Sequence, residues 1–189
     1  MKEKDFIEFA KIIGKLKRTP RTGWKMRGVK NSESIADHSF RTVLIGMVLA
    51  DLEGLDTEKV MRMLLLHDIE ESITGDITTL VKEKMDKEEL NNKQREAVKK
   101  ALSLLPKDLR SNYLLLWNEM EEEKTVEAKF CKDIDKLEMM IQLVDYEDED
   151  ETNKKKLKEF WSREDINTPK RIETLVKIYE ELKKERNVK

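Results

Sequence analysis

Cysteine, proline and glycine are scarce in this sequence. Its single cysteine, Cys131, cannot form a disulfide within the chain, which excludes a disulfide framework and a cysteine-cluster zinc site and suits a reducing cytoplasm. Only 6 glycines and 3 prolines occur in 189 residues, too few for the many turns of a β-sandwich or barrel. These absences favour long helices with short connections.

The sequence also lacks an excess of either charge and any long apolar run. Lys and Arg number 38 and Asp and Glu 40, a balance that excludes a surface built to bind polyanions as a whole. No stretch approaches the roughly 18 apolar residues of a membrane span, and the N-terminal residues lack the apolar region of a signal peptide. We expect a soluble cytoplasmic protein with one domain over residues 1–189 and a core from about residue 5 to 182.

Apolar residues recur every three or four positions along most of the chain, a spacing typical of amphipathic helices. The predicted helices cover residues 3–17, Ser34 to Gly54, Asp56 to His67, 90–105, 109–120, 125–147 and a C-terminal segment capped by Thr168 and opened by Pro169. Residues 21–30 and 74–80, the acidic run 145–151 and the lysines at 154–156 are predicted as loops. We expect an all-α bundle in which the helix through residues 43–52 is buried nearly all round and faces the helix through residues 60–66.

The only two histidines lie at the ends of apolar helices, beside aspartates. His38 follows an aspartate, and His67-Asp68 ends the apolar run 60–66. Imidazole and carboxylate together bind divalent ions such as Mn, Fe, Co, Ni or Zn, without selecting one of them. His67 and Asp68 point about 100° apart on a helix, so an ion between them needs a further helix, and Asp135 is the best acidic candidate. The residues alone leave open a purely structural role for both histidines.

These four residues resemble the H…HD…D signature of the HD-domain metal-dependent phosphohydrolase superfamily. Further segments are similar, in order and approximate spacing, to its 5'-deoxynucleotidase branch. They are Pro-Arg-Thr-Gly-Trp at 20–24, Glu-Ser-Ile-Ala-Asp-His-Ser at 33–39, His-Asp-Ile-Glu-Glu at 67–71, Thr-Gly-Asp at 74–76, Glu-Ala-Lys-Phe at 127–130 and Asp-Ile-Asp-Lys-Leu-Glu at 133–138. The resemblance covers roughly residues 5 to 182.

The resemblance implies an HD-domain helical bundle with a buried metal site between helices. It assigns a role to each of eight residues. The implied metal ligands are His38, His67, Asp68 and Asp135, the implied catalytic acids or ligands of a second ion are Glu71 and Asp76, and the implied substrate contacts are Arg21 and Trp24. The ion would be Mn, Co, Mg, Zn, Fe or Ni, and the active form a homodimer.

The implied reaction is removal of the 5'-phosphate from deoxyribonucleoside monophosphates. Glu71 would orient or deprotonate water, and Asp76 would protonate the leaving oxygen or position a water that does. Arg21 would bind phosphate while Trp24 covers the sugar or base. Without the resemblance, Glu71 and Asp76 would be read as a solvated loop and Trp24 as a core anchor. The substrate is expected to be a small nucleotide rather than a nucleic acid or a membrane.

Two other readings stay open. The chain could be another HD phosphohydrolase, acting on nucleoside triphosphates, cyclic nucleotides or alarmones, or a non-enzymatic helical scaffold. No G-x-x-x-x-G-K-[ST] loop occurs, which excludes a P-loop nucleotide hydrolase. Cys131 is interpreted as a small buried hydrophobic residue rather than a nucleophile.

Overall fold

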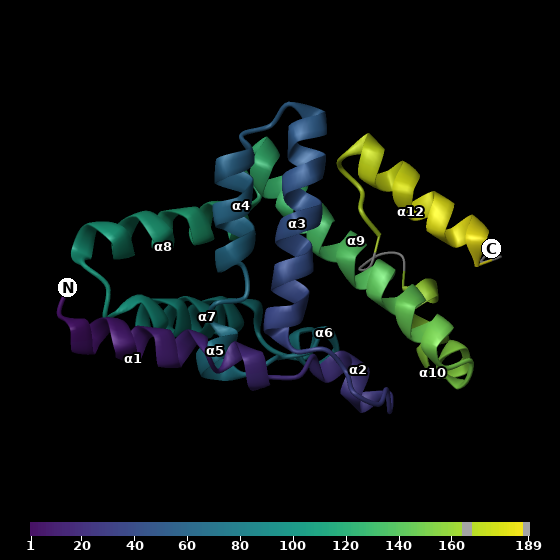
Figure 1. The fold of residues 1–189 in the computed structure, drawn as a ribbon, viewed down its shortest axis with the longest axis horizontal. Helices are drawn as coiled ribbons and strands as arrows, with labels where there is room; N and C mark the ends of the chain where they lie inside the picture. Colours follow the sequence, from purple (N-terminus) through teal and green to yellow (C-terminus); the bar gives the residue numbers. More distant parts are fainter. Residues whose placement is uncertain (164–167, 187–189) are drawn as a thin grey trace.

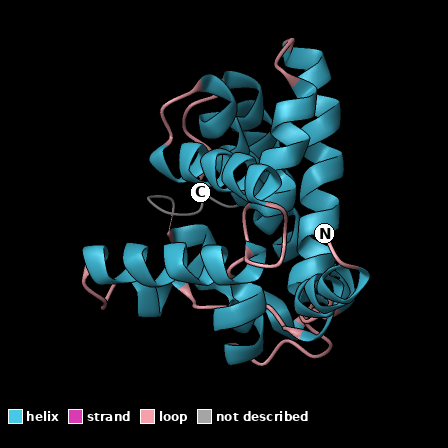
Figure 2. Cartoon of the chain, turned by 90° about the vertical axis from the view of Figure 1, so that its left-hand side faces the viewer, coloured by secondary structure: helices cyan, strands magenta, loops and turns pink. Residues whose placement is uncertain are grey.

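The computed structural model of the chain describes residues 1–163 and 168–186. Within these residues it is helical, with an isolated antiparallel bridge between Pro20 and Ser34 and no strand (Figures 1 and 2). The helices are α1 (Glu3–Ile13), a short 3-10 helix (Leu16–Arg18), α2 (Thr22–Met26), α3 (Ile35–Glu53), α4 (Thr57–Leu66), α5 (Glu71–Thr74), α6 (Thr79–Lys82), α7 (Lys87–Leu102), α8 (Lys107–Glu122), α9 (Val126–Glu149), α10 (Thr152–Ser162) and α12 (Glu173–Glu185). The predicted all-α fold is confirmed.

Helices α3 and α4 lie side by side at the centre, and α9 crosses behind them (Figure 1). α3 begins with a capping box, in which the Ser34 hydroxyl accepts the Asp37 backbone N–H and the Asp37 carboxylate accepts the Ser34 backbone N–H. It ends at Gly54, whose φ of 67° favours glycine. Gly46 lets α4 approach closely, because a Cβ at this position would lie 2.2 Å from Cδ1 of Leu64.

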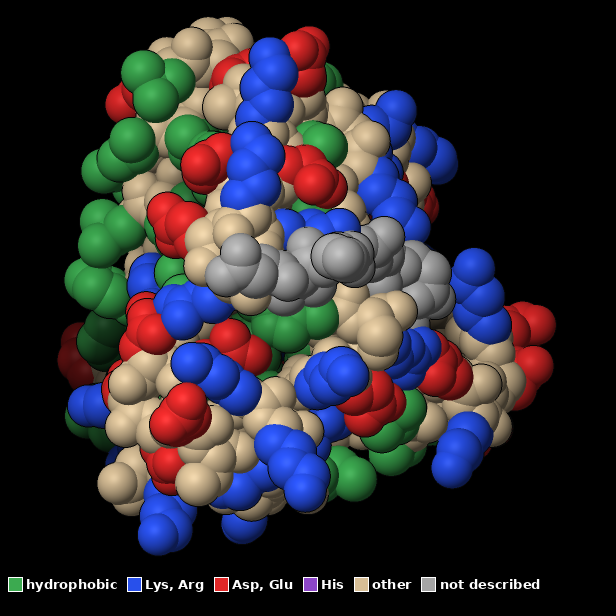
Figure 3. Space-filling model, turned by 90° about the vertical axis from the view of Figure 1, so that its right-hand side faces the viewer, with side chains coloured by type: hydrophobic (Ala, Val, Ile, Leu, Met, Phe, Trp, Pro, Cys, Tyr) green, Lys and Arg blue, Asp and Glu red, His purple; other side chains and the backbone are tan. Residues whose placement is uncertain are grey.

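The expectation that α3 is buried nearly all round is wrong. Four apolar side chains spaced four residues apart are 43–73% exposed and form one face of the helix. We call this face the α3 stripe; its members are Phe40, Leu44, Val48 and Leu52. Hydrophobic side chains gather along the left edge of the molecule in Figure 3, the side on which α3 lies. The neighbouring helices cover only the opposite side of α3.

Two hydrophobic clusters form the core. The larger joins α3, α4, α9, α10 and α12, and the smaller joins α7, α8 and the segment after α4 with packing from α1. Leu64 belongs to the larger cluster, whereas Leu66 and Ile69 belong to the smaller one. The dipeptide His67-Asp68 therefore lies where the two clusters meet.

Several predicted boundaries are wrong, most of them where a segment predicted as a loop is helical. The first helix stops at Ile13, and residues 21–30, predicted as a loop, contain α2. The segment 74–80 contains the end of α5 and the start of α6. Residues 145–149 of the acidic run lie in α9, and the lysines at 154–156 lie in α10, where Leu157 and Trp161 supply a buried face. Solvated charges on a helix surface were misread as loops.

The last helix begins at Glu173 rather than at Pro169. Thr168 does not cap α12 as expected, because the residue at the N-cap position is Ile172. Instead, the Asp133 carboxylate on α9 accepts the backbone N–H groups of residues 170, 171 and 172. A side chain from another helix thus positions the start of α12.

Among the described helices, none combines the length and apolar character that a membrane crossing needs.

Candidate metal centre and cleft

Three helices bring two histidines and an aspartate together. His38 lies on α3, His67 follows the last residue of α4, and Asp135 lies on α9. The two Nε2 atoms are 3.2 Å apart, and Asp135 Oδ1 lies 3.1 Å from Nε2 of His38 and 4.0 Å from that of His67. Both imidazoles are buried. One ligand atom from each residue lies within 4.8 Å of the others, close enough to share a metal ion.

Asp68 lies beside this group. Its Oδ2 is 3.1 Å from Nε2 of His67 and 3.8 Å from Nε2 of His38, yet this buried oxygen has no hydrogen-bond partner. Because α4 ends at Leu66, the chain turns at this point, and the angle of 100° expected on a continuous helix does not apply. The structure therefore brings three of the predicted ligands into one group and places the fourth, Asp68, against both imidazoles.

The outer nitrogens of both imidazoles face oxygen acceptors. Nδ1 of His67 lies 2.6 Å from the Leu64 carbonyl oxygen, and Nδ1 of His38 contacts Oε2 of Glu138. These oxygens accept hydrogen bonds, so each Nδ1 carries the hydrogen and each Nε2 of a neutral ring offers a lone pair to the same space. Two such lone pairs and the carboxylates of Asp135 and Asp68, the latter with an unpartnered buried oxygen, are a donor set that fits a divalent metal ion.

The pKa values of the cluster reflect the mutual attraction of its imidazoles and carboxylates. Burial raises the pKa of Asp68, but the imidazoles of His67 and His38 outweigh it, so the carboxyl's pKa is well below its usual range. Burial and Arg21 lower the pKa of His38, but its contacts with Asp135 and Glu138 outweigh them and raise it to about 9. A positive charge is therefore favoured among these carboxylates.

Glu71 and Asp76 lie next to the cluster. Burial, with the carboxylates of Asp68 and Asp76, raises the pKa of Glu71 to about 10, and its buried Oε2 has no hydrogen-bond partner. The Asp76 carboxylate accepts the backbone N–H of Thr22, and the Thr22 hydroxyl donates to the Asp76 carbonyl at 3.2 Å. These bonds tie the loop before α6 to the start of α2. Glu71 is thus placed to take up a cation or a proton.

Arg21 and Trp24 come from α2 and its N-terminal edge. Nη1 of Arg21 lies 3.7 Å from Asp68 Oδ2, so its guanidinium reaches a predicted metal ligand. Trp24 is only 2% exposed, donates its indole N–H to Glu33 at 3.0 Å and packs on Phe160 with ring centroids 4.5 Å apart. Trp24 is therefore a core residue that also forms a wall of the site.

A cleft of about 220 Å³ connects these groups. Arg21, Trp24, Glu71, Asp76 and the two predicted aspartate ligands all line it. Further cationic residues line the same space; they are Arg27, Lys82, Lys136 and Arg163. A cleft with acids at one side and several cations around it can bind a metal ion and an anionic group together.

The model of the HD domain matches residues 13–176. The chain belongs to the HD-domain family. The human protein named 5'-deoxynucleotidase HDDC2 is 40% identical over 145 residues, covering 77% of this chain and 70% of the human protein. The Xenopus laevis protein of the same name is 36% identical over 180 residues, covering 94% and 88%. A crystal structure of a Pyrococcus horikoshii protein is 36% identical with a TM-score of 0.76, covering 97% of this chain and 99% of that one.

Sequence reasoning missed several residues of this HD-domain cleft. Glu33 and Glu138 lie in segments that carry the resemblance, but they received no role. A carboxylate inside the apolar stripe of residues 130–144 was the available signal for Glu138, because a buried acid needs partners. Arg27 and Phe160 come from distant segments, and the guanidinium lies 4.4 Å from the ring centroid. No local pattern could have paired them.

Proposed function

We propose that this HD-domain protein is a metal-dependent phosphohydrolase that removes the 5'-phosphate from deoxyribonucleoside monophosphates. The observation that carries the proposal is the convergence of the histidine-aspartate cluster, Glu71 and Arg21 on one cleft. Relatives named 5'-deoxynucleotidase, 36–41% identical in vertebrates, support the choice of substrate.

In this proposal the metal ligands are His38, His67, Asp68 and Asp135. A bound divalent ion lowers the pKa of water and withdraws charge from a phosphoryl oxygen. The donor set suits Mn, Fe, Co, Ni or Zn, and Mg is a further candidate because of the two carboxylates. Glu71 and Asp76 are the candidate ligands of a second ion, since both carboxylates face the same cleft.

The other cleft residues receive the following roles. Glu71 orients the attacking water and takes its proton; a neighbouring cation favours the ionised form that this role needs. Asp76 protonates the leaving 5'-oxygen or positions a water that does. Arg21 binds phosphate oxygens with its guanidinium, and Trp24 lies against the sugar or base. The flat contact of an indole ring tolerates different bases.

A phosphate-release screen tests the proposal. Purified protein is incubated with deoxy- and ribonucleoside mono-, di- and triphosphates, cyclic nucleotides and alarmones, each with Mn, Co, Mg, Zn, Fe or Ni. We expect release from deoxyribonucleoside monophosphates. A preference for another nucleotide class would support a different HD phosphohydrolase, and no release from any nucleotide would favour a scaffold.

Arg21→Ala tests the phosphate contact within this proposal. The charge contact already exists in the ground state, so the variant should raise KM about tenfold or more, along with any loss in kcat. Steady-state kinetics with one deoxyribonucleoside monophosphate decide this. An unchanged KM would remove Arg21 from the phosphate site.

The proposal includes assembly, domain organisation and compartment. We assign the α3 stripe to contact with a second copy of the chain, because a self-complementary apolar face suits a two-fold homodimer. Light scattering at micromolar protein should give a dimer mass, and Leu44→Glu should give a monomer.

One domain is favoured because the cleft draws residues from Arg21 to Arg163. The free thiol of Cys131 suits a cytoplasmic location.

A further inference from the structure

The two imidazoles of the cluster differ in what holds their outer nitrogens. Nδ1 of His67 donates to the carbonyl oxygen of Leu64 within its own helix, a neutral acceptor that follows from the backbone. Nδ1 of His38 donates to Oε2 of Glu138, a side chain on a different helix. The His38 ring is thus oriented by a replaceable group, whereas the His67 ring is not.

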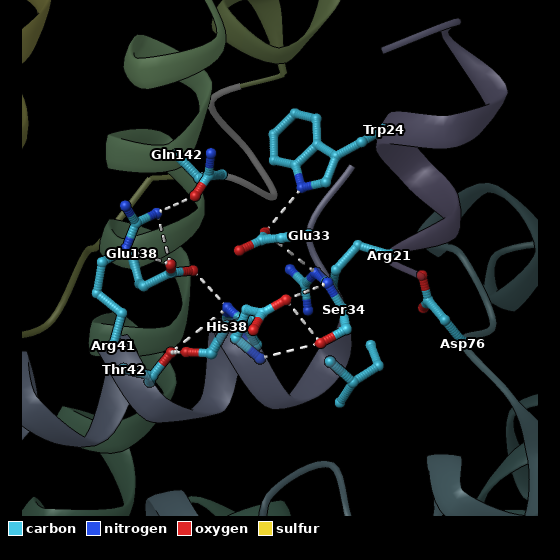
Figure 4. A network of polar contacts seen from close by, with 12 residues as sticks. Arg21, Trp24, Glu33, Ser34, His38, Arg41, Thr42, Asp76, Glu138 and Gln142 are labelled. Atoms are coloured by element: carbon cyan, nitrogen blue, oxygen red, sulfur yellow. Dashed lines mark hydrogen bonds and ion pairs between the residues drawn. The ribbon is translucent and has the colours of Figure 1, made fainter. Parts of the chain in front are cut away.

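Glu138 is completely buried, and each of its oxygens has a partner. Oε2 accepts from His38, and Oε1 accepts from Nε of Arg41 at 2.7 Å (Figure 4). The Arg41 guanidinium is always protonated and can only donate, so the Glu138 oxygen that faces it is an acceptor. The other oxygen is left to accept from Nδ1 of His38.

Arg41 fixes this carboxylate from the other side. Its guanidinium also donates to Gln142 and, at 2.6 Å, to Asp145, so one fork contacts three side chains of α9. His38 and Arg41 lie three residues apart on α3, on the same side of the helix. The arginine and the histidine consequently approach the same carboxylate from neighbouring turns. Turning the His38 ring over would break its hydrogen bond to Glu138.

We propose that Glu138, braced by Arg41, is a positioning residue that fixes His38 with its Nε2 lone pair directed at the metal ion. The inference rests on the proposed function, because it takes His38 as a metal ligand. Partners that hold a ligating histidine in this way also make the ring a stronger donor, and their loss costs about 10- to 100-fold in metal affinity. Glu138 touches neither the substrate nor the ion in this scheme.

Metal titration of three variants tests the inference. Metal-free wild type, Glu138→Gln, Arg41→Lys and Glu147→Gln are titrated with Mn²⁺ by calorimetry, and with Co²⁺ while its visible absorption is recorded. Glu147 is the matched control, because it is a buried glutamate of α9 that accepts one side-chain N–H, from Trp161 at 3.0 Å. Circular dichroism and melting curves of the metal-free proteins report folding.

We expect Glu138→Gln to weaken Mn²⁺ binding about 10- to 100-fold and to change the Co²⁺ spectrum, because an amide oxygen accepts a weaker hydrogen bond from Nδ1 than a carboxylate does and makes the ring a poorer donor. Arg41→Lys, which keeps the charge but loses the fork, should weaken binding about threefold. Glu147→Gln should bind like wild type, even where its melting temperature falls. Should Glu138→Gln not fold, the Arg41→Lys titration carries the test.

The possible failures are distinguishable. If wild type binds Mn²⁺ and the folded Glu138→Gln or Arg41→Lys variants bind as tightly with an unchanged Co²⁺ spectrum, the positioning role is wrong while the metal site stands. If Glu147→Gln weakens binding as much as Glu138→Gln, the effect is general to α9 and the inference is also overturned. If wild type binds no divalent ion, both the inference and the proposed metal site fail.

Discussion

Asp133 and Asp135 lie two residues apart on α9 and belong to regions with opposite properties. Positions two apart on a helix point about 200° apart, so the two carboxylates face different sides. Asp133 faces the segment before α12, accepts three backbone N–H groups at 2.7–3.3 Å and pairs with Arg171 at 3.1 Å. Asp135 faces the two imidazoles and the cleft.

The difference is whether the protein itself supplies every partner. On the Asp133 side, backbone and guanidinium hydrogens serve the buried carboxylate. On the cleft side, one oxygen of Asp68 and one of Glu71 are buried without a hydrogen-bond partner. Buried polar groups normally find partners because leaving them alone costs free energy. A buried carboxylate whose hydrogen bonds are all made within the protein, such as Asp133, therefore connects two segments of the fold. A group of buried carboxylates with unpartnered oxygens indicates a place for a ligand.

Removing the satisfied acid should give the largest effect on stability. Asp133→Ala leaves three backbone N–H groups without their acceptor, so we expect the free energy of unfolding to fall by about 3 kcal/mol. Urea unfolding followed by circular dichroism measures this. Mn²⁺ affinity of the folded variant should equal that of wild type. Loss of metal binding with unchanged stability would reverse the roles assigned to the two aspartates.

Neutralising an unsatisfied acid should affect the reaction instead. Glu71→Gln should lower kcat about 100-fold or more, equivalent to about 2.7 kcal/mol in the barrier, because the amide cannot take a proton from water. The unfolding free energy should stay the same or rise, since the buried carboxyl makes no hydrogen bond through Oε2. Metal content of the same variant is the control. Near-normal turnover with metal bound would shift the role to Asp76.

Adding metal should act on the cleft side alone. At a free Mn²⁺ concentration about 30 times its Kd, we expect stabilisation by about 2 kcal/mol over metal-free protein, because the ion binds only where ligands from separate helices converge. Melting curves with chelator and with Mn²⁺ test this. Asp133→Ala should gain as much as wild type, whereas Asp68→Ala should gain little. Equal gains in all three proteins would argue against this site.

The smallest effect is expected at Cys131, which lies on α9 one turn from Asp135. Burial raises the pKa of its thiol to about 12, so only about one molecule in ten thousand carries the reactive thiolate at pH 8. The native protein should therefore not react with a thiol reagent at pH 8, and its reaction should rise with pH. Full reaction in urea is the control. Rapid native labelling would mean that this part of α9 is open.

The sequence predicted those features that depend on neighbours along the chain. Ser34 and Asp37 cap α3 as expected, and the apolar spacing predicted the long helix α9 that carries Asp135. The convergence of His38 and His67 was a hypothesis from polar residues at the ends of apolar helices, and the structure brings them together. Local spacing is enough for such features because helix geometry is regular.

Features that depend on distant partners could not be predicted in this way. The start of α12 is fixed by Asp133, which is 37 residues from the first N–H it accepts. The exposure of the α3 stripe depends on which helices pack nearby, and apolar spacing does not give this. The pairing of Arg41 with Glu138 spans 97 residues. Each depends on a contact between segments far apart in the sequence, and the local sequence pattern does not specify which segments meet.

The close approach of α3 and α4 at Gly46 influences the spacing of the two histidines. Gly46 lies eight residues from His38 on α3, a rise of about 12 Å, and it touches α4 at Leu64, three residues before His67. The crossing of α3 and α4 is therefore far from His38 along α3 and close to His67 along α4. The distance between the two imidazoles thus depends on a helix contact that neither histidine makes, and this contact is possible because Gly46 has no side chain.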